Sequence, residues 1–288
     1  MKTQSECIPC IINSFLKLAE TDTIPEQQQE DILRQLLVYL SRVDYNQSPP
    51  VMGRTLQKLI RESLQNPDPY HRLKQHYNHL MLELYPSSKE MVENSADPFD
   101  TAMRLALAGN EIDFGSKYQF DIMEHIQLAM DHQLAIDDSR ELRHDLTHAD
   151  TLLYIGDNCG EIVLDKLFLE SIRVPRKYFV VRESAVINDI TADDAMMTGM
   201  DQIAKVITTG DNSPGAVWES ASNDFKDHFV KADVVISKGQ GNLEGLIDVP
   251  HDHVYFLLVT KCELIAERIG TRVGDYVIKR GQKGDRSV

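Results

Sequence analysis

The sequence predicts an α/β protein, in which an N-terminal helical domain (residues 1–150) precedes an α/β domain (residues 151–288) built on a mostly parallel sheet. Two observations predict this division. Glycine is unevenly distributed, because twelve of the fifteen glycines follow residue 150. The spacing of apolar residues also changes near that position, from helical intervals to short β-branched runs.

Three segments of the first half carry apolar residues at three- and four-residue spacing, which places one apolar stripe along a helix. These segments are 25–43, 56–64 and 73–84. Prolines lie between such segments or near their starts, where a missing amide hydrogen costs least: Pro25, Pro49, Pro67, Pro86 and Pro98. The first 150 residues are therefore expected to be helical.

The second half alternates short apolar runs with glycine-containing turns and amphipathic segments. The runs are TLLYI (151–155), KYFVV (177–181), QIAKVI (202–207), ADVVIS (232–237) and HVYFLLV (253–259), with DYVIK (275–279) expected as an edge strand. This alternation predicts a parallel sheet with helices on its faces. Ligands of such sheets bind outside the carboxyl ends of the strands, so the residues after each run are the candidates for chemistry.

Charge and composition exclude several classes of protein. The chain has 288 residues and a formal net charge of −15, which argues against nucleic acid or an anionic membrane as a partner. It contains no apolar run of the roughly 18 to 20 residues that a membrane helix needs, and its N-terminus lacks the apolar region of a signal peptide. We therefore expect a cytoplasmic protein. Its four cysteines are too few for a disulfide scaffold and are expected to be thiols.

The first predicted strand is followed by GDNCGEIVLD, which places Asp157 and Asn158 side by side at the start of a helix. Carboxylate and amide oxygens are the ligands that Mg²⁺ and Mn²⁺ prefer, so this pair predicts part of a site for a hard cation. Gly160 would let the backbone approach a phosphate at the helix N-terminus. The alternative is that Asp157 or Asn158 only caps the helix.

The second predicted strand is followed by RESAVINDIT, with Arg182 at the strand tip and Asp189 before the next helix. Asp189 could complete a metal triad with Asp157 and Asn158, and Arg182 could bind a phosphate or pair with a carboxylate. The alternative for Asp189 is again a cap, for a helix that begins near Thr191.

The fourth predicted strand ends in SKGQGNLEGL, where Lys238 precedes Gly239, Gly241 and Asn242. A lysine before a glycine-rich turn can neutralise a phosphoryl group while backbone amides bind its oxygens. The order differs from a nucleotide P-loop, because the lysine comes before the glycines. A surface lysine in a flexible turn is the alternative interpretation.

Cysteines form two further features. Cys7 and Cys10 have the two-residue spacing of a metal corner or a redox pair, but no second pair of this kind follows. Cys262 follows Lys261 after the fifth predicted strand, where a helix N-terminus and a lysine would both lower the pKa of a thiol. A small buried side chain is the alternative for Cys262.

These motifs together closely resemble the metal-dependent damage-control phosphatase family, also called domain of unknown function 89. They are CIPC, AGNEIDFG (108–115), GDNCGEIVLD, VINDIT, SKGQGNLEGL and the TKC turn, in that order along nearly the whole chain. The sequence looks most like the stand-alone microbial branch, which carries a cysteine pair at the positions of Cys7 and Cys10. The resemblance implies a Rossmann-like three-layer α/β/α domain beside the helical domain. It also implies hydrolysis of small phosphorylated metabolites with a divalent cation.

The resemblance also implies roles for single residues. It assigns metal binding to Asp157, Asn158 and Asp189, and a phosphoryl contact to Lys238. Asn110 and Asp113, from AGNEIDFG, would join the substrate pocket by similarity only, because periodicity gives no reason to bring them to the strand tips. Without the resemblance, this segment is a helix end followed by a loop.

The expected mechanism is phosphomonoester hydrolysis at one divalent cation, with Mg²⁺, Mn²⁺, Co²⁺ and Ni²⁺ as the candidates. Lys238 and the amides from Gly239 to Gly241 would stabilise developing charge, and either a metal-activated water or Asp157 would be the nucleophile. Two alternatives remain: an S-adenosylmethionine-dependent methyltransferase, and a non-catalytic metal-dependent protein that binds phosphometabolites. The sequence predicts neither the native metal, the physiological substrate nor the oligomeric state.

Overall fold

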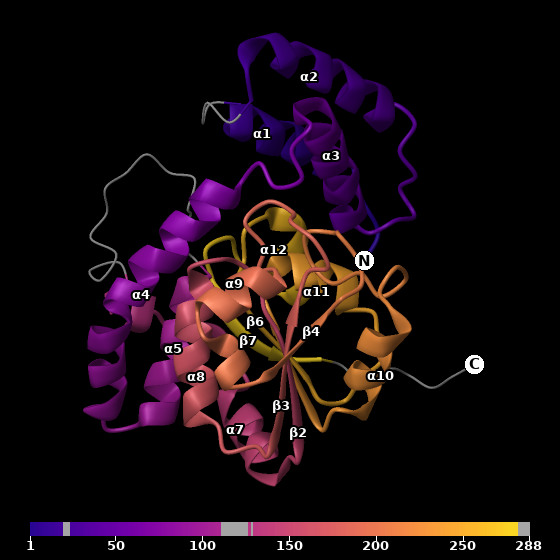
Figure 1. Ribbon diagram of the computed structural model, residues 1–288. Helices are drawn as coiled ribbons and strands as arrows, with labels where there is room; N and C mark the ends of the chain where they lie inside the picture. The colour runs from indigo at the N-terminus through magenta and orange to yellow at the C-terminus, as the bar shows by residue number, and fades with distance from the viewer. Residues whose placement is uncertain (20–23, 111–125, 128, 282–288) are drawn as a thin grey trace.

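The core of the protein is one seven-stranded sheet (Figure 1). A computed structural model describes residues 1–19, 24–110, 126–127 and 129–281. The strands of the sheet follow the order β1-β7-β6-β5-β2-β3-β4. Their bounds are β1 Leu134–Asp137, β2 Thr151–Ile155, β3 Arg176–Val181, β4 Lys205–Thr208, β5 Val234–Lys238, β6 Val254–Val259 and β7 Tyr276–Arg280.

The sheet is mostly parallel, as predicted. Strands β2 to β6 share one direction, while β7 runs antiparallel to β6, and β1 runs parallel to β7. Two expectations are wrong. The segment around β7 is not an edge strand, because β7 lies between β1 and β6. The first 150 residues are not all helical, because β1 belongs to the sheet; its four residues are too few to show a strand pattern in the sequence.

Helices precede the sheet and alternate with its strands. Their bounds are α1 Cys7–Ala19, α2 Glu26–Leu40, α3 Pro49–Leu64, α4 His71–Glu93, α5 Pro98–Gly109, α7 Ser139–His148, α8 Glu161–Ser171, α9 Ala192–Met197, the 3₁₀ helix η1 Met200–Gln202, α10 Asn223–Lys231, α11 Gln240–Leu246 and α12 Glu263–Ile269. Pro86 lies inside α4 rather than between helices, which corrects the expectation from the sequence. Burial of Met81 before it and of Ser88 and Val92 after it holds both halves of this helix against neighbours, which offsets the lost hydrogen bond.

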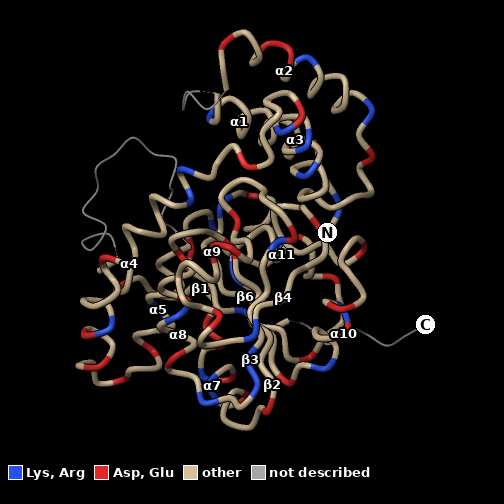
Figure 2. The backbone as a smooth tube through the Cα atoms, viewed as in Figure 1, with Lys and Arg blue, Asp and Glu red and all other residues tan. Residues whose placement is uncertain are grey.

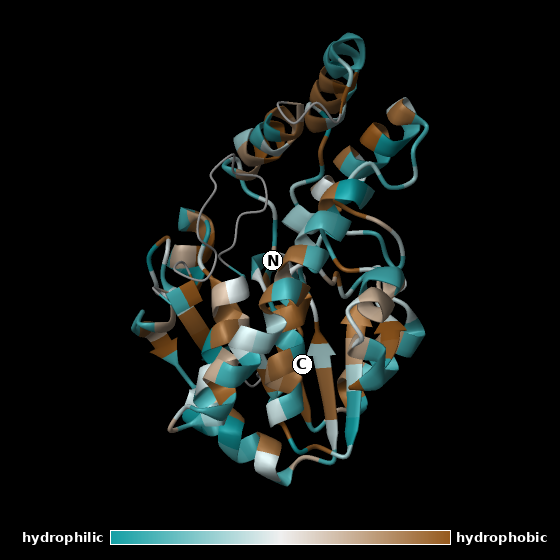
Figure 3. Ribbon diagram, turned by 60° about the vertical axis from the view of Figure 1, so that its left-hand side comes forward, coloured by the Kyte–Doolittle hydropathy of each residue, from teal (hydrophilic) through white to brown (hydrophobic). Residues whose placement is uncertain are grey.

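Two apolar clusters show the three layers. One face of the sheet packs against α4, α5, α7 and α8, in a cluster that includes Tyr154, Phe168 and Leu257. The other face packs against α10, α11 and α12, in a cluster that includes Leu153 and Phe225. Figure 3 shows the hydrophobic strands between these helices. The chain therefore has the α/β/α architecture that the sequence predicted.

Helices α1, α2 and α3 form a third apolar cluster of their own. Figure 1 shows them beyond one end of the sheet. Two contacts tie α3 to loops at the carboxyl ends of the strands: Arg54 Nη1 lies 2.7 Å from Asp211 Oδ1, and Arg61 Nη1 donates to the carbonyl of Ala185 at 2.9 Å. Helices α4 and α5, unlike α1–α3, pack against a face of the sheet. Residues well before position 150 therefore already contribute to the core around the sheet. The division of the chain into two domains at that residue stays a prediction.

Charged residues of both signs are distributed along the outer helices and loops (Figure 2). Among the described residues, no helix combines the length and the apolar character that crossing a membrane requires.

Candidate active site

The predicted site residues meet where the order of the strands reverses. Strands β2 and β5 are neighbours, but the chain continues from β2 to β3 and β4 on one side and from β5 to β6 on the other. In open α/β sheets, ligands bind at the carboxyl ends of the strands at such a switch point. Asp157 follows β2 and Lys238 ends β5, so both lie at this crevice.

Backbone hydrogen bonds join the loop after β2 to the loop after β3. The N–H of Cys159 donates to the carbonyl of Asn188 at 2.8 Å, and the N–H of Ile190 donates to the carbonyl of Asp157 at 3.0 Å. Asn158 and Asp189 form an isolated antiparallel bridge between these two bonds. The three predicted metal ligands, Asp157, Asn158 and Asp189, are therefore brought together by the backbone.

The buried side chain of Arg182 lies between Asp157 and Asp189 and contacts both carboxylates. Its side chain is only 1% exposed. Its Nε donates to Asp189 Oδ2 at 2.6 Å, and its Nη2 lies 3.7 Å from Asp157 Oδ1. The remaining nitrogen, Nη1, has no hydrogen-bond partner among the described residues. Arg182 thus pairs with carboxylates, which is one of the two roles considered for it, and its Nη1 remains available for a further acceptor.

Asn110 reaches the strand tips from the end of α5. Its Nδ2 donates to Asp157 Oδ2 at 3.1 Å, and its Oδ1 accepts from the N–H of Val259 at 3.2 Å, at the end of β6. The resemblance therefore places Asn110 correctly beside the site, where periodicity alone could not. Asp113 lies outside the described residues.

Lys238 occupies a different position from the one predicted. The sequence suggests a contact with a phosphoryl group, but the side chain of Lys238 is completely buried. Its ammonium donates to Glu161 Oε1 at 2.5 Å, to Asp165 Oδ1 at 2.5 Å and to the carbonyl of Ala106 at 2.8 Å. These three acceptors use all three hydrogens of the ammonium. In this structure the ammonium of Lys238 is therefore bonded within the protein and is not free to contact a phosphoryl group.

Glu161 and Asp165 belong to the motif GDNCGEIVLD, but the sequence analysis assigned them no role, and the structure places both beside the candidate site. Both project from α8 and are completely buried. Glu161 Oε2 accepts from the side-chain nitrogens of Asn110 at 3.3 Å and Asn158 at 3.2 Å, while Asp165 accepts from the hydroxyl of Tyr154 at 2.6 Å. A signal was present: two carboxylates four residues apart lie on the same face of a helix that is otherwise largely apolar.

The buried charges of this network do not balance. Four carboxylates and two cations lie within it: Asp157, Glu161, Asp165, Asp189, Arg182 and Lys238. With all four carboxylates ionised, the formal charge of this network is −2. Burial, together with the charges of Glu161 and Asp189, raises the pKa of Asp157 to about 7, although Lys261 and Arg182 act in the opposite direction. Burial also raises the pKa of Asp189, despite its bond to Arg182.

This imbalance fits a divalent cation at the three predicted ligands. Two carboxylates and an amide are hard oxygen donors, and Asn158 already donates from its nitrogen to Asp157 Oδ2 at 2.9 Å, so its carbonyl oxygen is the atom suited to a cation. A dication would cancel the two excess negative charges. Among the described residues, no group of three or more His, Cys, Asp or Glu side chains is arranged to hold a metal ion. The proposed ligand set differs from such a group, because it combines two carboxylates with an amide.

The glycine-rich turn packs tightly against the site. Gly239 has φ +77°, and a Cβ there would overlap the carboxylate of Asp157. Its N–H donates to the carbonyl of Leu257 at 2.9 Å, so this amide is not directed at a phosphate. A Cβ at Gly241 would lie 2.8 Å from the carbonyl oxygen of Pro214. These glycines permit close approach of the backbone. The predicted phosphate contact of the Gly239 amide is wrong, because that amide donates to Leu257, and a phosphate contact at Gly241 stays a prediction.

Asn242 was predicted to bind substrate, but its side chain is completely buried and bonded at both ends. Its Oδ1 accepts from Arg182 Nη2 at 3.0 Å and from the N–H of Ala216 at 2.6 Å. Its Nδ2 donates to the carbonyls of Gly156 at 3.1 Å and Lys238 at 2.6 Å. Asn242 therefore orients Arg182 and joins the turns after β2 and β5.

Replacing Gly239 with alanine should lower kcat/KM on a phosphomonoester by about 10²-fold, because the new methyl group would displace the Asp157 carboxylate by the order of 1 Å. Steady-state kinetics with p-nitrophenyl phosphate measures this effect. Gly270→Ala is the matched control: Gly270 also has positive φ, but a methyl group added there would meet no atom within 4 Å. Equal losses of activity in both variants would contradict the close approach of Gly239 to Asp157.

The cysteine pair lies at the start of α1, away from these strand tips in the sequence but near Cys262. Partial burial, with the charge of Glu244 adding to it, raises the pKa of the Cys7 thiol, although a hydrogen bond from the backbone near Gln4 acts in the opposite direction, while Cys10 is exposed. Cys262 immediately precedes α12, and its Sγ accepts from Gln240 Nε2 at 3.4 Å. All four cysteines are free thiols, as expected. The metal or redox role of Cys7 and Cys10 stays a prediction.

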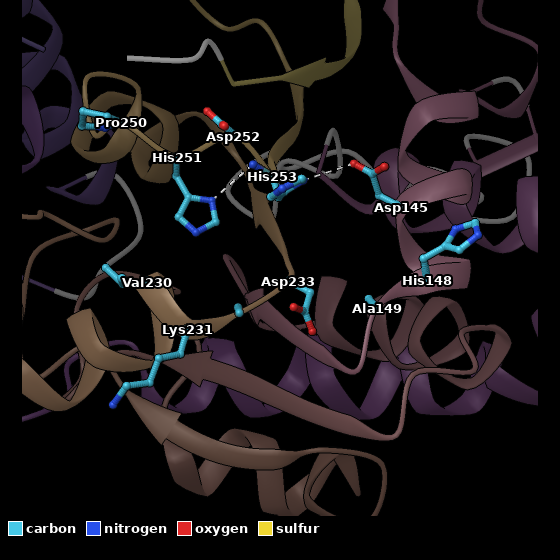
Figure 4. A pocket seen from close by; sticks show the side chains of 11 residues that line it. Asp145, His148, Ala149, Val230, Lys231, Asp233, Pro250, His251, Asp252 and His253 are labelled. Carbon is cyan, nitrogen blue, oxygen red and sulfur yellow. Dashed lines mark hydrogen bonds and ion pairs between the residues drawn. The ribbon is translucent and has the colours of Figure 1, made fainter. Parts of the chain in front are cut away.

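A cavity lies away from these residues, at the ends where the strands begin. It has a volume of about 560 Å³ and is lined by residues that include Asp145, His148, Asp233, His251 and His253 (Figure 4). Asp233 directly precedes β5 and His253 directly precedes β6. This cavity therefore lies at the amino ends of the strands, whereas Asp157 lies at the carboxyl ends. Its size therefore does not identify it as the site of the predicted chemistry.

Known proteins resemble the chain over nearly its whole length. Uncharacterized protein MJ0202 of Methanocaldococcus jannaschii is 35% identical, over 96% of this chain and 95% of that protein. Damage-control phosphatase PH1575 of Pyrococcus horikoshii is 32% identical, over 98% and 99%. A damage-control phosphatase of Archaeoglobus fulgidus is 28% identical, over 97% and 99%.

The fold agrees with these sequence comparisons. A crystal structure of a DUF89 family protein from Pyrococcus horikoshii superposes with a TM-score of 0.88 at 30% identity, over 98% of this chain and 100% of that one. The family described as damage-control phosphatase ARMT1-like domain matches residues 3–277. With the motifs of the strand tips gathered at one site, these matches show that the chain belongs to the damage-control phosphatase ARMT1-like (DUF89) family.

Proposed function

We propose that the protein is a divalent-metal-dependent phosphatase that hydrolyses small phosphorylated metabolites. Membership of a phosphatase family supports the reaction type. Two relatives that match almost the full chain are named damage-control phosphatases, which supports damaged phosphometabolites as the substrate class. The observation that carries the metal dependence is the formal charge of −2 buried beside Asp157, Asn158 and Asp189. A cytoplasmic location stays a prediction.

In this proposal, Asp157, Asn158 and Asp189 hold the cation, which is Mg²⁺, Mn²⁺, Co²⁺ or Ni²⁺. When bound there, it would polarise the phosphoryl oxygens and neutralise the charge that develops on them. Arg182 holds Asp189 in place through the 2.6 Å bond and offers Nη1 as a further donor. Lys261, which is exposed and close enough to lower the pKa of Asp157, is the cation best placed to meet a phosphate arriving from solvent.

Asp157 is held in a fixed orientation by Asn110 and Asn158, whose side-chain nitrogens donate to the same oxygen, Oδ2, at 3.1 and 2.9 Å. Its other oxygen, Oδ1, lies toward Arg182. Two nucleophiles fit this arrangement: a water molecule, or the Asp157 carboxylate with formation of an aspartyl-phosphate. Trapping of a phosphorylated Asp157, detected by mass spectrometry after rapid quenching, would identify the second.

A metal-restoration screen tests the proposal. Protein stripped of metal with a chelator should not hydrolyse p-nitrophenyl phosphate or a panel of sugar phosphates, and at least one of the four cations should restore turnover. Full activity of the stripped protein would contradict metal dependence. Metal-dependent binding of phosphometabolites without turnover under every cation would favour a binding protein instead. Buried carboxylates lie in the turn after β2, at Asp157, and at the first residue of α8, at Glu161, and they suit a cation better than the adenosyl cofactor of a methyltransferase.

A further inference from the structure

Ile187 has an unusual backbone conformation beside the proposed metal ligands. It has φ +45°, and it is one of two non-glycine residues with positive φ among the described residues. A β-branched side chain is strongly disfavoured in this conformation. Ile187 lies two residues before Asp189, in the loop that follows β3. Surrounding contacts must therefore hold the loop in this shape.

The contacts that hold Ile187 come from the N-terminal helices. Its half-buried side chain packs against the apolar cluster of α1, α2 and α3, which includes Phe15, Met52 and Ile60. Arg61, also on α3, donates to the carbonyl of Ala185 at 2.9 Å. The α1–α3 cluster thus holds this loop at two points, one apolar and one polar, just before the residues that face the site.

The other side of the loop is joined to the site itself. The N–H of Asp189 donates to the carbonyl of Val186 at 3.0 Å, so Ile187 lies within the turn that directs Asp189. Asn188 then accepts from the N–H of Cys159, and Asp189 bonds to Arg182. A change in the backbone at Ile187 would therefore move the Asp189 carboxylate.

We infer that Ile187 is a positioning residue for Asp189, through which the docking of α1–α3 sets the geometry of the cation site. This inference rests on the proposed function, because it takes Asp189 as a metal ligand. On this inference, α1–α3 do more than lie over the carboxyl ends of the strands. Their apolar contact with Ile187 holds the turn, with its positive φ, in the conformation that binds the cation. Loss of that contact would weaken cation binding without removing any ligand.

Two substitutions at Ile187 distinguish the effect of its apolar contact with the α1–α3 cluster from the effect of its positive φ. Ile187→Asn removes the apolar contact while tolerating positive φ, and Ile187→Leu keeps an apolar side chain without the β-branch. Calorimetric titration of metal-stripped protein with Mn²⁺ should show a Kd about tenfold higher for Ile187→Asn, in the range typical of residues that support metal ligands. Ile187→Leu should stay within about twofold of the wild type, since its apolar contact remains. At saturating Mn²⁺, Ile187→Asn should recover most of the wild-type kcat on p-nitrophenyl phosphate.

The matched control is Gln65→Gly. Gln65 is the other non-glycine residue with positive φ, at 49°, but it ends α3 as an exposed cap. This control should leave the Mn²⁺ affinity unchanged. Circular dichroism establishes that each variant is folded; if Ile187→Asn is not, Arg61→Gln tests the second attachment of the loop and should also raise the Kd.

An unchanged Mn²⁺ affinity in folded Ile187→Asn, or in Arg61→Gln where the first variant does not fold, would overturn the inference while leaving the proposed function intact. Wild-type protein that binds none of Mg²⁺, Mn²⁺, Co²⁺ and Ni²⁺, and hydrolyses a phosphomonoester with none of them, would instead overturn the proposed function, and the positioning role with it. The wild-type titration alone distinguishes these two results.

Discussion

Replacing Asp157 with asparagine should lower kcat/KM for p-nitrophenyl phosphate by about 10³-fold, equivalent to ~4 kcal/mol of transition-state stabilisation. The substitution keeps the shape of the side chain but removes one of the two carboxylates of the proposed cation site. It also removes a candidate nucleophile. The charge left in the buried network falls from −2 to −1, so a dication would no longer be matched.

The same substitution, Asp157→Asn, should not lower the free energy of unfolding, although it lowers activity. Asp157 is a buried anion near Glu161 and Asp189, and metal-free protein without that charge should be at least as stable as the wild type. Mn²⁺ should raise the melting temperature of the wild type, because it binds the folded state, and should raise that of Asp157→Asn much less. Differential scanning fluorimetry measures both quantities.

Asp227→Asn is the matched control, because Asp227 is 69% exposed on α10 and forms only a surface pair with Lys231. It should leave activity and the Mn²⁺-induced shift unchanged. If Asp157→Asn kept metal-dependent activity within tenfold of the wild type, the assignment of the site to the carboxyl ends of β2 and β3 would be wrong.

The sequence predicted the centre of the sheet well because the central strands β2, β5 and β6 are buried almost throughout. The runs that became β2, β3, β5 and β6 are continuous and apolar, which is typical of the central strands of a parallel sheet. The edge was harder to predict. Strand β1 has four residues with alternating burial, and β7 is placed in the interior by its pairing with β1, a contact between segments more than 130 residues apart.

The sequence predicted which residues meet at the ends of the strands. It predicted less well what the side chain of Lys238 contacts there. Asp157, Asn158 and Asp189 follow strands and could be grouped by the geometry of parallel sheets. The role of Lys238 depends on Glu161 and Asp165, which lie on α8 and turn inward beneath the strand tip. Local sequence does not show whether a lysine at a strand end faces solvent or the helix layer. The packing of α8 against the sheet, which brings Glu161 and Asp165 to the end of β5, determines the direction of the Lys238 side chain.

The buried acidic pair on α8 makes Lys238 important for stability. Lys238→Met should lower the free energy of unfolding by about 3 to 5 kcal/mol, because it leaves Glu161 and Asp165 as buried carboxylates without their shared cation. A loss of that size is a large part of the stability of a typical protein. Urea denaturation followed by circular dichroism measures it.

Two further variants show whether charge burial causes the loss. Adding Glu161→Gln and Asp165→Asn to Lys238→Met removes the unpaired charges and should recover a substantial part of the lost stability, whereas Lys58→Met, at a 66% exposed position, should change it by less than about 0.5 kcal/mol. The single variant also separates the phosphoryl contact predicted from the sequence from the buried contacts that the structure shows for this lysine. Protein that stays as stable as the wild type and binds Mn²⁺ normally, but does not hydrolyse phosphomonoesters, would indicate a direct phosphoryl contact. A large loss of stability that is reversed by neutralising the acidic pair identifies Lys238 as the cation that holds Glu161, and through it Asn110 and Asn158, in place beside Asp157.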